Sequence, residues 1–205
     1  SQEVEGKKKI TEVKTYSAQY ELEEIKENIT INTNTSSKPS KEQIINQAFK
    51  FHSEGNISEA AKYYQSFVNQ GYEDHRVFSN YGMMLRGLGK LKEAEIILQK
   101  AIQIDSDFAI AHYNLGNVFR DIGKLKEAEL SYYKAIEINP DYAVAHSNLG
   151  NIFRDIGKFK EAEIAIQKAI EINPSFAIAH FNLGAILRDL GKFKEAEIAI
   201  QKAIK

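Results

Sequence analysis

The stretch AIAHYNLGNVFRDIGKLKEAELSYYKAIEINPDY, residues 109 to 142, is the unit from which the fold can be predicted, because the chain repeats it. The next 34 residues read AVAHSNLGNIFRDIGKFKEAEIAIQKAIEINPSF, and the sequence from residue 177 onward begins AIAHFNLGAILRDLGKFKEAEIAIQKAIK. A fixed period of this length is the signature of stacked supersecondary units. Such units bury their apolar residues in slices between neighbours rather than around one centre.

Each unit is predicted to be a pair of antiparallel helices. In the unit at 109–142, Gly123 separates predicted helices over 109–122 and 125–138, because glycine adopts the positive φ of a helix end at little cost. Pro140 stops the second helix, since proline cannot continue one. The sequence therefore predicts an all-α solenoid of helix hairpins. A glycine recurs in this register at Gly55, Gly89, Gly123, Gly157 and Gly191.

The domain organisation follows from the same register. Residues 1–40 are rich in Ser, Thr, Asn and charge, so we expect a low-complexity segment that is extended or disordered. From Tyr16 to Leu22 larger and polar residues alternate, which is either chance or an extended peptide that docks on the repeats. The repeat array is predicted over residues 41–205, in units 41–74, 75–108, 109–142, 143–176 and an incomplete 177–205.

The composition excludes several classes of function. The formal net charge is -1, so the chain has no general electrostatic attraction to nucleic acid or to anionic lipid. The chain has no cysteine, and no apolar run reaches the ~20 residues that a membrane span needs. We find no nucleophile–base pair, no metal-binding spacing and no cofactor motif. We expect a chain that is not an enzyme, in the cytoplasm unless a signal before Ser1 was removed.

The repeated residues also resemble a known family. Leu115, Gly116, Phe119, Ala128, Tyr132, Ala135 and Pro140 have the spacing of the tetratricopeptide repeat, and residues 41–205 as a whole resemble this family. The resemblance implies a right-handed superhelix in which the first helices of the hairpins line a concave, peptide-binding groove. Residues 146–152 are most similar to the repeats at the front of O-linked N-acetylglucosamine transferases.

Polar residues recur on the first helices. At 100° per residue, Leu115 and Phe119 share the core face, whereas Asn114 and Asn117 are predicted to project from the opposite side. Asn114 belongs to a column that comprises Asn46, Asn80, Asn114, Asn148 and Asn182. Parallel columns hold Arg86, Arg120, Arg154 and Arg188, and Asp121, Asp155 and Asp189.

The asparagine column is our main candidate for function. A side-chain amide can pair with the peptide group of any residue, so the column could hold an extended ligand with little dependence on its sequence. In the transferases, asparagines at this position hold acceptor polypeptides, which is what the resemblance implies here. The alternatives are that the asparagines bond neighbouring repeats and that the arginines pair with the aspartates. The predicted peptide-binding residues are Asn46, Asn80, Asn114, Asn148, Asn182, Asn117, Asn151, Tyr113, Phe181, Arg120, Arg154 and Arg188.

These residues predict a scaffold that binds an extended peptide or protein segment, with residues 16–22 of the same chain as one possible ligand. Two alternatives stay open at this point. The chain could be the substrate-recruiting front of a larger enzyme such as a glycosyltransferase. It could also be a structural element that forms homo-oligomers through its open C-terminal end or its N-terminal segment.

Overall fold

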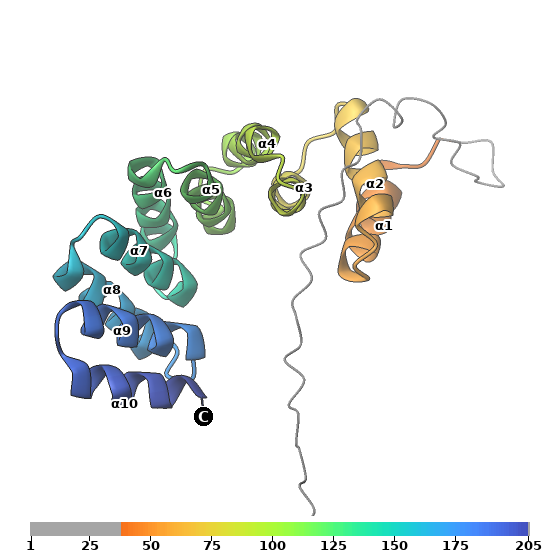
Figure 1. Ribbon diagram of the computed structural model, residues 1–205. Helices are drawn as coiled ribbons and strands as arrows, with labels where there is room; N and C mark the ends of the chain where they lie inside the picture. The colour runs from red at the N-terminus through yellow and green to blue at the C-terminus, as the bar shows by residue number, and fades with distance from the viewer. Residues whose placement is uncertain (1–37, 205) are drawn as a thin grey trace, which may run out of the picture. The chain divides into compact units, whose positions relative to one another are not determined.

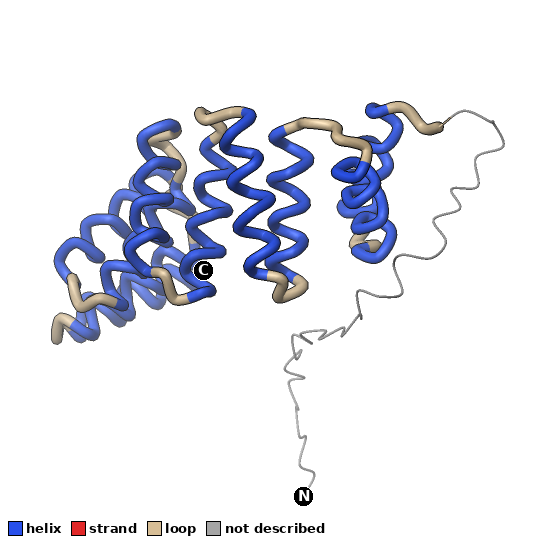
Figure 2. Tube along the Cα trace, turned by 90° about the horizontal axis from the view of Figure 1, so that it is seen from above, coloured by secondary structure: helices blue, strands red, loops and turns tan. Residues whose placement is uncertain are grey.

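A computed structural model describes residues 38–204, and within that range the chain is helical with no strand (Figure 2). The predicted all-α class is confirmed, whereas the segment from Tyr16 to Leu22 lies outside the described residues. None of the described helices is long and apolar enough to cross a bilayer. The helices are α1 (Lys41–Ser53), α2 (Ile57–Asn69), α3 (His75–Gly87), α4 (Leu91–Ile104), α5 (Ala109–Ile122), α6 (Leu125–Ile138), α7 (Ala143–Asp155), α8 (Phe159–Ile172), α9 (Ala177–Asp189) and α10 (Phe193–Ile204).

The helices pack as consecutive pairs, from α1 with α2 to α9 with α10, and neighbouring pairs pack on one another (Figure 1). The predicted solenoid of helix hairpins is therefore confirmed. The second helix of each pair contacts the first helix of the next, and α3 with α5 and α7 with α9 are also in contact. A first helix such as α5 is consequently covered by its own partner α6 and also by the preceding pair.

Within a pair, a glycine on the first helix makes room for a large residue on the second. A Cβ added to Gly116 would lie 2.7 Å from the ring of Tyr132, a side chain that is fully buried. A real Cβ does not approach another carbon so closely, so only glycine permits this helix separation. The same contact recurs between Gly82 and Leu98, Gly150 and Ile166, and Gly184 and Ile200.

The turn inside each hairpin depends on a left-handed glycine. Gly123 has a φ of 87°, and its N–H donates to the carbonyl of Arg120 at 3.0 Å. A residue with a Cβ is strained in this conformation, whereas glycine is not. The other four glycines of the register also have positive φ, which confirms the predicted helix ends.

We expect Gly123→Ala to lower the free energy of unfolding by about 1–2 kcal/mol, the cost of left-handed backbone for an L-residue. Gly87→Ala is the matched control, because Gly87 is helical and has open space around it. This substitution should raise the stability by about 0.4–1 kcal/mol through the unfolded state. Urea denaturation followed by circular dichroism measures both changes. Equal effects of the two substitutions would contradict the conclusion that Gly123 needs the left-handed conformation.

Candidate interaction surface

The candidate surface comprises the residues of α1, α3, α5, α7 and α9 at the positions of the asparagine, arginine and aspartate columns. We call it the first-helix surface. Asn46 is exposed, and Asn80, Asn148, Asn151 and Asn182 are partly buried. Asn114 and Asn117, however, are only 5% and 3% exposed. The prediction that these two side chains project away from the buried surface is therefore wrong.

Stacking explains this burial. Leu115 and Phe119 of α5 pack in the hairpin core, as predicted, but Ala111 and Val118 are also completely buried. At 100° per residue, Ala111 and Val118 lie about 40° and 60° from Leu115. They widen the predicted stripe on the side toward Asn114. The preceding hairpin contacts α5 through both α3 and α4. A first helix inside the stack is thus buried on more than one side.

The asparagine column links successive hairpins through hydroxyl groups. The Nδ2 of Asn114 donates to Ser79 Oγ at 3.0 Å, and Asn182 Nδ2 donates to Ser147 Oγ at 3.3 Å. Asn148 Nδ2 lies 3.3 Å from the hydroxyl of Tyr113, again 35 residues back. At Asn80 the corresponding residue is Ile45, which has no hydroxyl. Three of the five asparagines therefore bond a neighbouring repeat, and peptide binding by the column remains a prediction.

A buried polar cluster joins α5, α6 and α7. The hydroxyl of Tyr132 donates to Asn117 Oδ1 at 2.9 Å, and the same oxygen accepts from Asn148 Nδ2 at 2.9 Å. Burial raises the pKa of Tyr132 to about 12, so the hydroxyl remains a neutral donor at neutral pH. Asn117 and Asn148 thus stabilise the junction between the two hairpins.

The arginine column pairs with the aspartate column at two junctions. Arg86 Nε lies 2.6 Å from Asp121 Oδ2, and Arg154 Nε lies 2.6 Å from Asp189 Oδ2. Arg120 instead lies 3.5 Å from the neighbouring Asp121. Such partly exposed pairs contribute at most about 1 kcal/mol each. The pairing of arginine with aspartate, which the sequence left open, therefore occurs at these two junctions.

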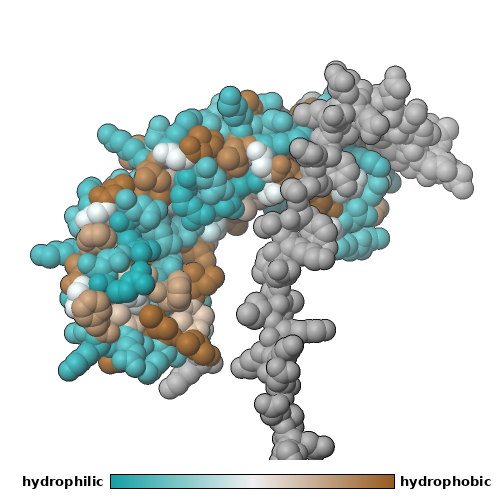
Figure 3. Space-filling model, in the orientation of Figure 1, coloured by the Kyte–Doolittle hydropathy of each residue, from teal (hydrophilic) through white to brown (hydrophobic). Residues whose placement is uncertain are grey.

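Exposed apolar side chains lie beside these polar groups. On α9, Ile178 and Phe181 are 63% and 59% exposed, and Ile110 of α5 is also exposed. Tyr113 is different, because its ring packs against Tyr132 and Tyr142 at centroid distances of 5.9 and 5.1 Å. Hydrophobic residues reach the surface around α9 and α10 (Figure 3). Among the first helices, the exposed large apolar side chains are therefore concentrated on α9.

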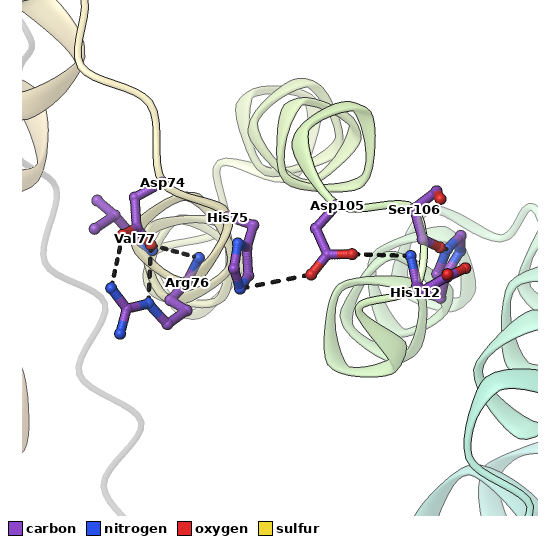
Figure 4. A network of polar contacts seen from close by, with 8 residues as sticks. Asp74, His75, Arg76, Val77, Asp105, Ser106 and His112 are labelled. Carbon is purple, nitrogen blue, oxygen red and sulfur yellow. Dashed lines mark hydrogen bonds and ion pairs between the residues drawn. The ribbon is translucent and has the colours of Figure 1, made fainter.

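The recurring histidines hold the turns between hairpins. His112 Nε2 lies 2.9 Å from the Ser106 carbonyl (Figure 4), and His146 and His180 make the same contact with the carbonyls of Pro140 and Pro174. A carbonyl only accepts, so Nε2 carries the proton in each case. Across residues 38–204, no group of three or more acidic or histidine side chains is placed to hold a metal ion.

Sequence reasoning missed the partners of the asparagines. Ser79 and Ser147 are each 1% exposed, and with Tyr113 they stand one residue before an asparagine of the column. A hydroxyl-bearing residue directly before an asparagine of the column was the sequence signal for these hydrogen bonds between repeats. Its meaning depends on the offset between stacked hairpins, which the sequence does not state.

Comparison with known proteins agrees with this architecture. Tetratricopeptide repeat models match residues 109–142 and 143–176. Two further models of the repeat match 82–119 and 165–198, so that together the matches span more than half of the 205 residues. The comparison with curated protein sequences found no match.

Several solved structures share the fold. MamA 41-end from Desulfovibrio magneticus RS-1 superposes with a TM-score of 0.71 at 21% identity, covering 82% of this chain and 96% of that one. A tetratricopeptide repeat protein from Parabacteroides merdae gives 0.68 at 20% identity, covering 80% and 65%. YrrB, described as a TPR protein with an unusual peptide-binding site, gives 0.65 at 22% identity, covering 80% and 85%. With its repeated hairpins, glycine contacts and matching repeat models, the chain belongs to the tetratricopeptide repeat family.

Proposed function

We propose that the chain is a protein-interaction scaffold that binds an extended segment of a partner protein on its first-helix surface. The observation that carries this proposal is the exposure of Ile178 and Phe181 next to Asn182 on α9. Burying such a side chain fully against a partner contributes about 1.5–3 kcal/mol. The apolar pair supplies affinity, and the neighbouring amide supplies contacts to the backbone of the ligand.

Hydrogen bonds to Ser147 and to its equivalents limit how the asparagines can contribute to ligand binding. Asn182 gives one N–H to Ser147, and among the described residues its Oδ1 has no hydrogen-bond partner. That bond orients the amide, so Oδ1 is free to accept from a peptide N–H. Asn114 is too buried for this role. We therefore propose that Asn46, Asn80, Asn148 and Asn182 contact the ligand, with the resemblance to O-linked N-acetylglucosamine transferase repeats as support.

The spacing of the hairpins fits an extended ligand. Neighbouring helices pack 8 to 10 Å apart, and an extended chain advances ~3.3 Å per residue. About every third ligand residue would then meet an asparagine. The exposed Arg188 offers a contact for an acidic side chain on the same ligand. The peptide-binding site named for YrrB, a protein of similar fold, is consistent with this proposal.

The test begins with peptides that are selected from a random library for binding to the full chain. It then determines where on the chain these peptides bind. We expect the double variant Ile178→Ser/Phe181→Ser to weaken their binding by at least tenfold, the effect of about 1.4 kcal/mol. The matched control is Ile164→Ser, which removes an equally exposed isoleucine from α8. Isothermal titration calorimetry measures both affinities. Equal affinities for the double variant and the wild type would show that the first-helix surface is not the site.

The N-terminal segment of the chain is a second candidate ligand for the same surface. If residues 16–22 bind there, they compete with any added peptide. Deleting residues 1–37 should then raise the affinity for a selected peptide. An unchanged affinity would exclude the segment as a competitor, and the main proposal would stand.

A further inference from the structure

The outer side of α10 carries an exposed apolar stripe. Ile200 is 37% exposed, whereas the residues at its position in α4, α6 and α8 are completely buried. Phe193 and Ile204 are 70% and 81% exposed, and at 100° per residue they lie within about 40° of Ile200. The helices α4, α6 and α8 each pack against two first helices, their own and the next, whereas α10 packs against α9 at one end of the row (Figure 1). The stripe therefore lies where the earlier second helices receive the next hairpin.

The inner junctions show what kind of helix covers such a stripe. Ala111 and Val118 stand seven residues apart on one side of α5 and are completely buried. Gln43 and Lys50 hold the same two positions on α1 and are exposed. Because no described hairpin precedes α1, these two positions are the ones that face the preceding hairpin. An inner first helix thus docks through small or branched apolar residues. The same pair is completely buried at Ala145 with Ile152 and at Ala179 with Ile186.

Ion pairs reinforce two of these junctions. Lys124 Nζ, which follows α5, lies 3.2 Å from Glu95 Oε1 of α4, and Lys192 Nζ lies 2.8 Å from Glu163 Oε2 of α8. In both hairpins the lysine stands three residues after the aspartate that pairs with an arginine of the preceding hairpin. The incoming hairpin therefore brings an aspartate and a lysine, and the hairpin before it receives them with an arginine and a glutamate.

The last hairpin presents the receiving half of both pairs. Glu197 stands at the position of Glu95, and within residues 38–204 its only side-chain contact is a hydrogen bond from Gln201 Nε2 at 3.5 Å. Arg188 stands at the position of the paired arginines, but it lies 3.9 Å from its own neighbour Asp189 and its side chain is 65% exposed. The apolar stripe, the arginine and the glutamate together repeat the surface that α5 and α9 meet at their junctions.

We propose that the outer side of α10 binds a helix of a partner protein that carries the docking pattern of an inner first helix. The pattern consists of two small or branched apolar residues seven positions apart, an aspartate three residues later and a lysine three residues after that. The apolar pair would cover Ile200, and the lysine would meet Glu197. This surface lies outside the first-helix surface, so the proposal does not rest on peptide binding there.

The first helix of the chain itself lacks the pattern, which argues against a second copy as the occupant. Gln43 and Lys50 stand at the apolar positions, and Ser53 and Asn56 replace the aspartate and the lysine. Stacking α1 of a second copy on α10 would bury a lysine against the apolar stripe and leave Glu197 without a cation. The two ends of the array are therefore not complementary to each other.

The test uses the full chain with labelled isoleucine methyl groups and a synthetic peptide with the sequence of residues 109–142, which contains the complete pattern. In NMR spectra this peptide should fold on binding and shift the methyl signals of Ile200 and Ile204. Ile198 lies about 160° from Ile200 on the same helix, so its signal should not move. The matched control is a peptide of equal length with the sequence of residues 41–74, which should cause no shift.

A charge exchange tests whether the lysine meets Glu197. Glu197→Lys should weaken binding of the 109–142 peptide roughly fivefold, because an attraction becomes a repulsion. The same variant should regain most of this affinity for a peptide that carries Lys124→Glu. Ile204→Ser should weaken binding roughly threefold, whereas Ile198→Ser should not. Both isoleucines are exposed, so neither substitution disturbs the core.

Three results of these titrations would overturn the proposal. The first is the absence of any shift at Ile200 and Ile204 with the 109–142 peptide. The second is equal binding of the control peptide, and the third is failure of the exchanged peptide to regain affinity for Glu197→Lys.

Other occupants of the same surface would also overturn the proposal. A dimer of the wild-type chain that Ile204→Ser dissociates, seen by light scattering, would assign the surface to a second copy. Movement of the Ile200 and Ile204 signals when residues 1–37 are deleted would assign it to that segment. Peptide capture by Ile178 and Phe181 does not involve α10, so the two proposals can fail separately.

Discussion

Replacing Tyr132 with alanine should lower the free energy of unfolding by about 3–5 kcal/mol, the usual cost of removing a buried aromatic ring. Tyr132 is fully buried, fills the space over Gly116, and donates its hydroxyl to Asn117. The substitution leaves a cavity in the hairpin, and Asn117 Oδ1 keeps only the hydrogen bond from Asn148 at the junction with the next one. Urea denaturation followed by circular dichroism measures the loss.

The adjacent Tyr133 provides the control for this prediction. It stands on the same helix and is 46% exposed, so Tyr133→Ala should cost much less. Tyr132→Phe removes only the hydroxyl, and we expect a loss of about 0.5–1.5 kcal/mol. Similar losses for Tyr132→Ala and Tyr133→Ala would mean that Tyr132 is not the centre of the hairpin core.

Asn114→Ala should lower the free energy of unfolding by about 1–3 kcal/mol, because it leaves the buried hydroxyl of Ser79 without its partner. Asn46→Ala is the matched control, since Asn46 stands in the same column but is exposed. This variant should change stability by less than about 0.5 kcal/mol. The same urea titration compares the two.

A double-mutant cycle then tests the pair itself. The combined variant Ser79→Ala/Asn114→Ala should cost less than the sum of the two single changes, because the second removes a group that is already unpaired. Strict additivity would show that the two side chains do not interact. The outcome also bears on function, because a stabilising Asn114 cannot be removed to probe ligand binding without weakening the stack.

The two alternative functions that the sequence left open can each be tested directly. The alternative of a recruiting segment in a larger enzyme is checked by reading the coding sequence beyond Lys205. The alternative of a self-assembling element is checked by light scattering with and without residues 1–37. An unchanged mass would exclude that segment as the link between copies.

The hairpins could be predicted from the sequence alone. The helices predicted over 109–122 and 125–138 are α5 and α6, and Gly123 ends the first of them in the left-handed conformation. Gly116 belongs to the spacing that resembles the tetratricopeptide repeat, and its close approach to Tyr132 lies within the same unit. These features depend on residues within one unit, where helix periodicity and the needs of glycine and proline act locally.

Which side chains remain available for a ligand depends on how the hairpins stack, and the sequence did not predict it. Asn114 looked exposed because the helical period identifies one buried stripe, whereas stacking buries α5 against the preceding hairpin as well. Its partner Ser79 lies 35 residues away, one position off the repeat, and that offset is set by how the hairpins stack. Contacts between units are properties of the assembled stack, and a repeat sequence states only what each unit contains.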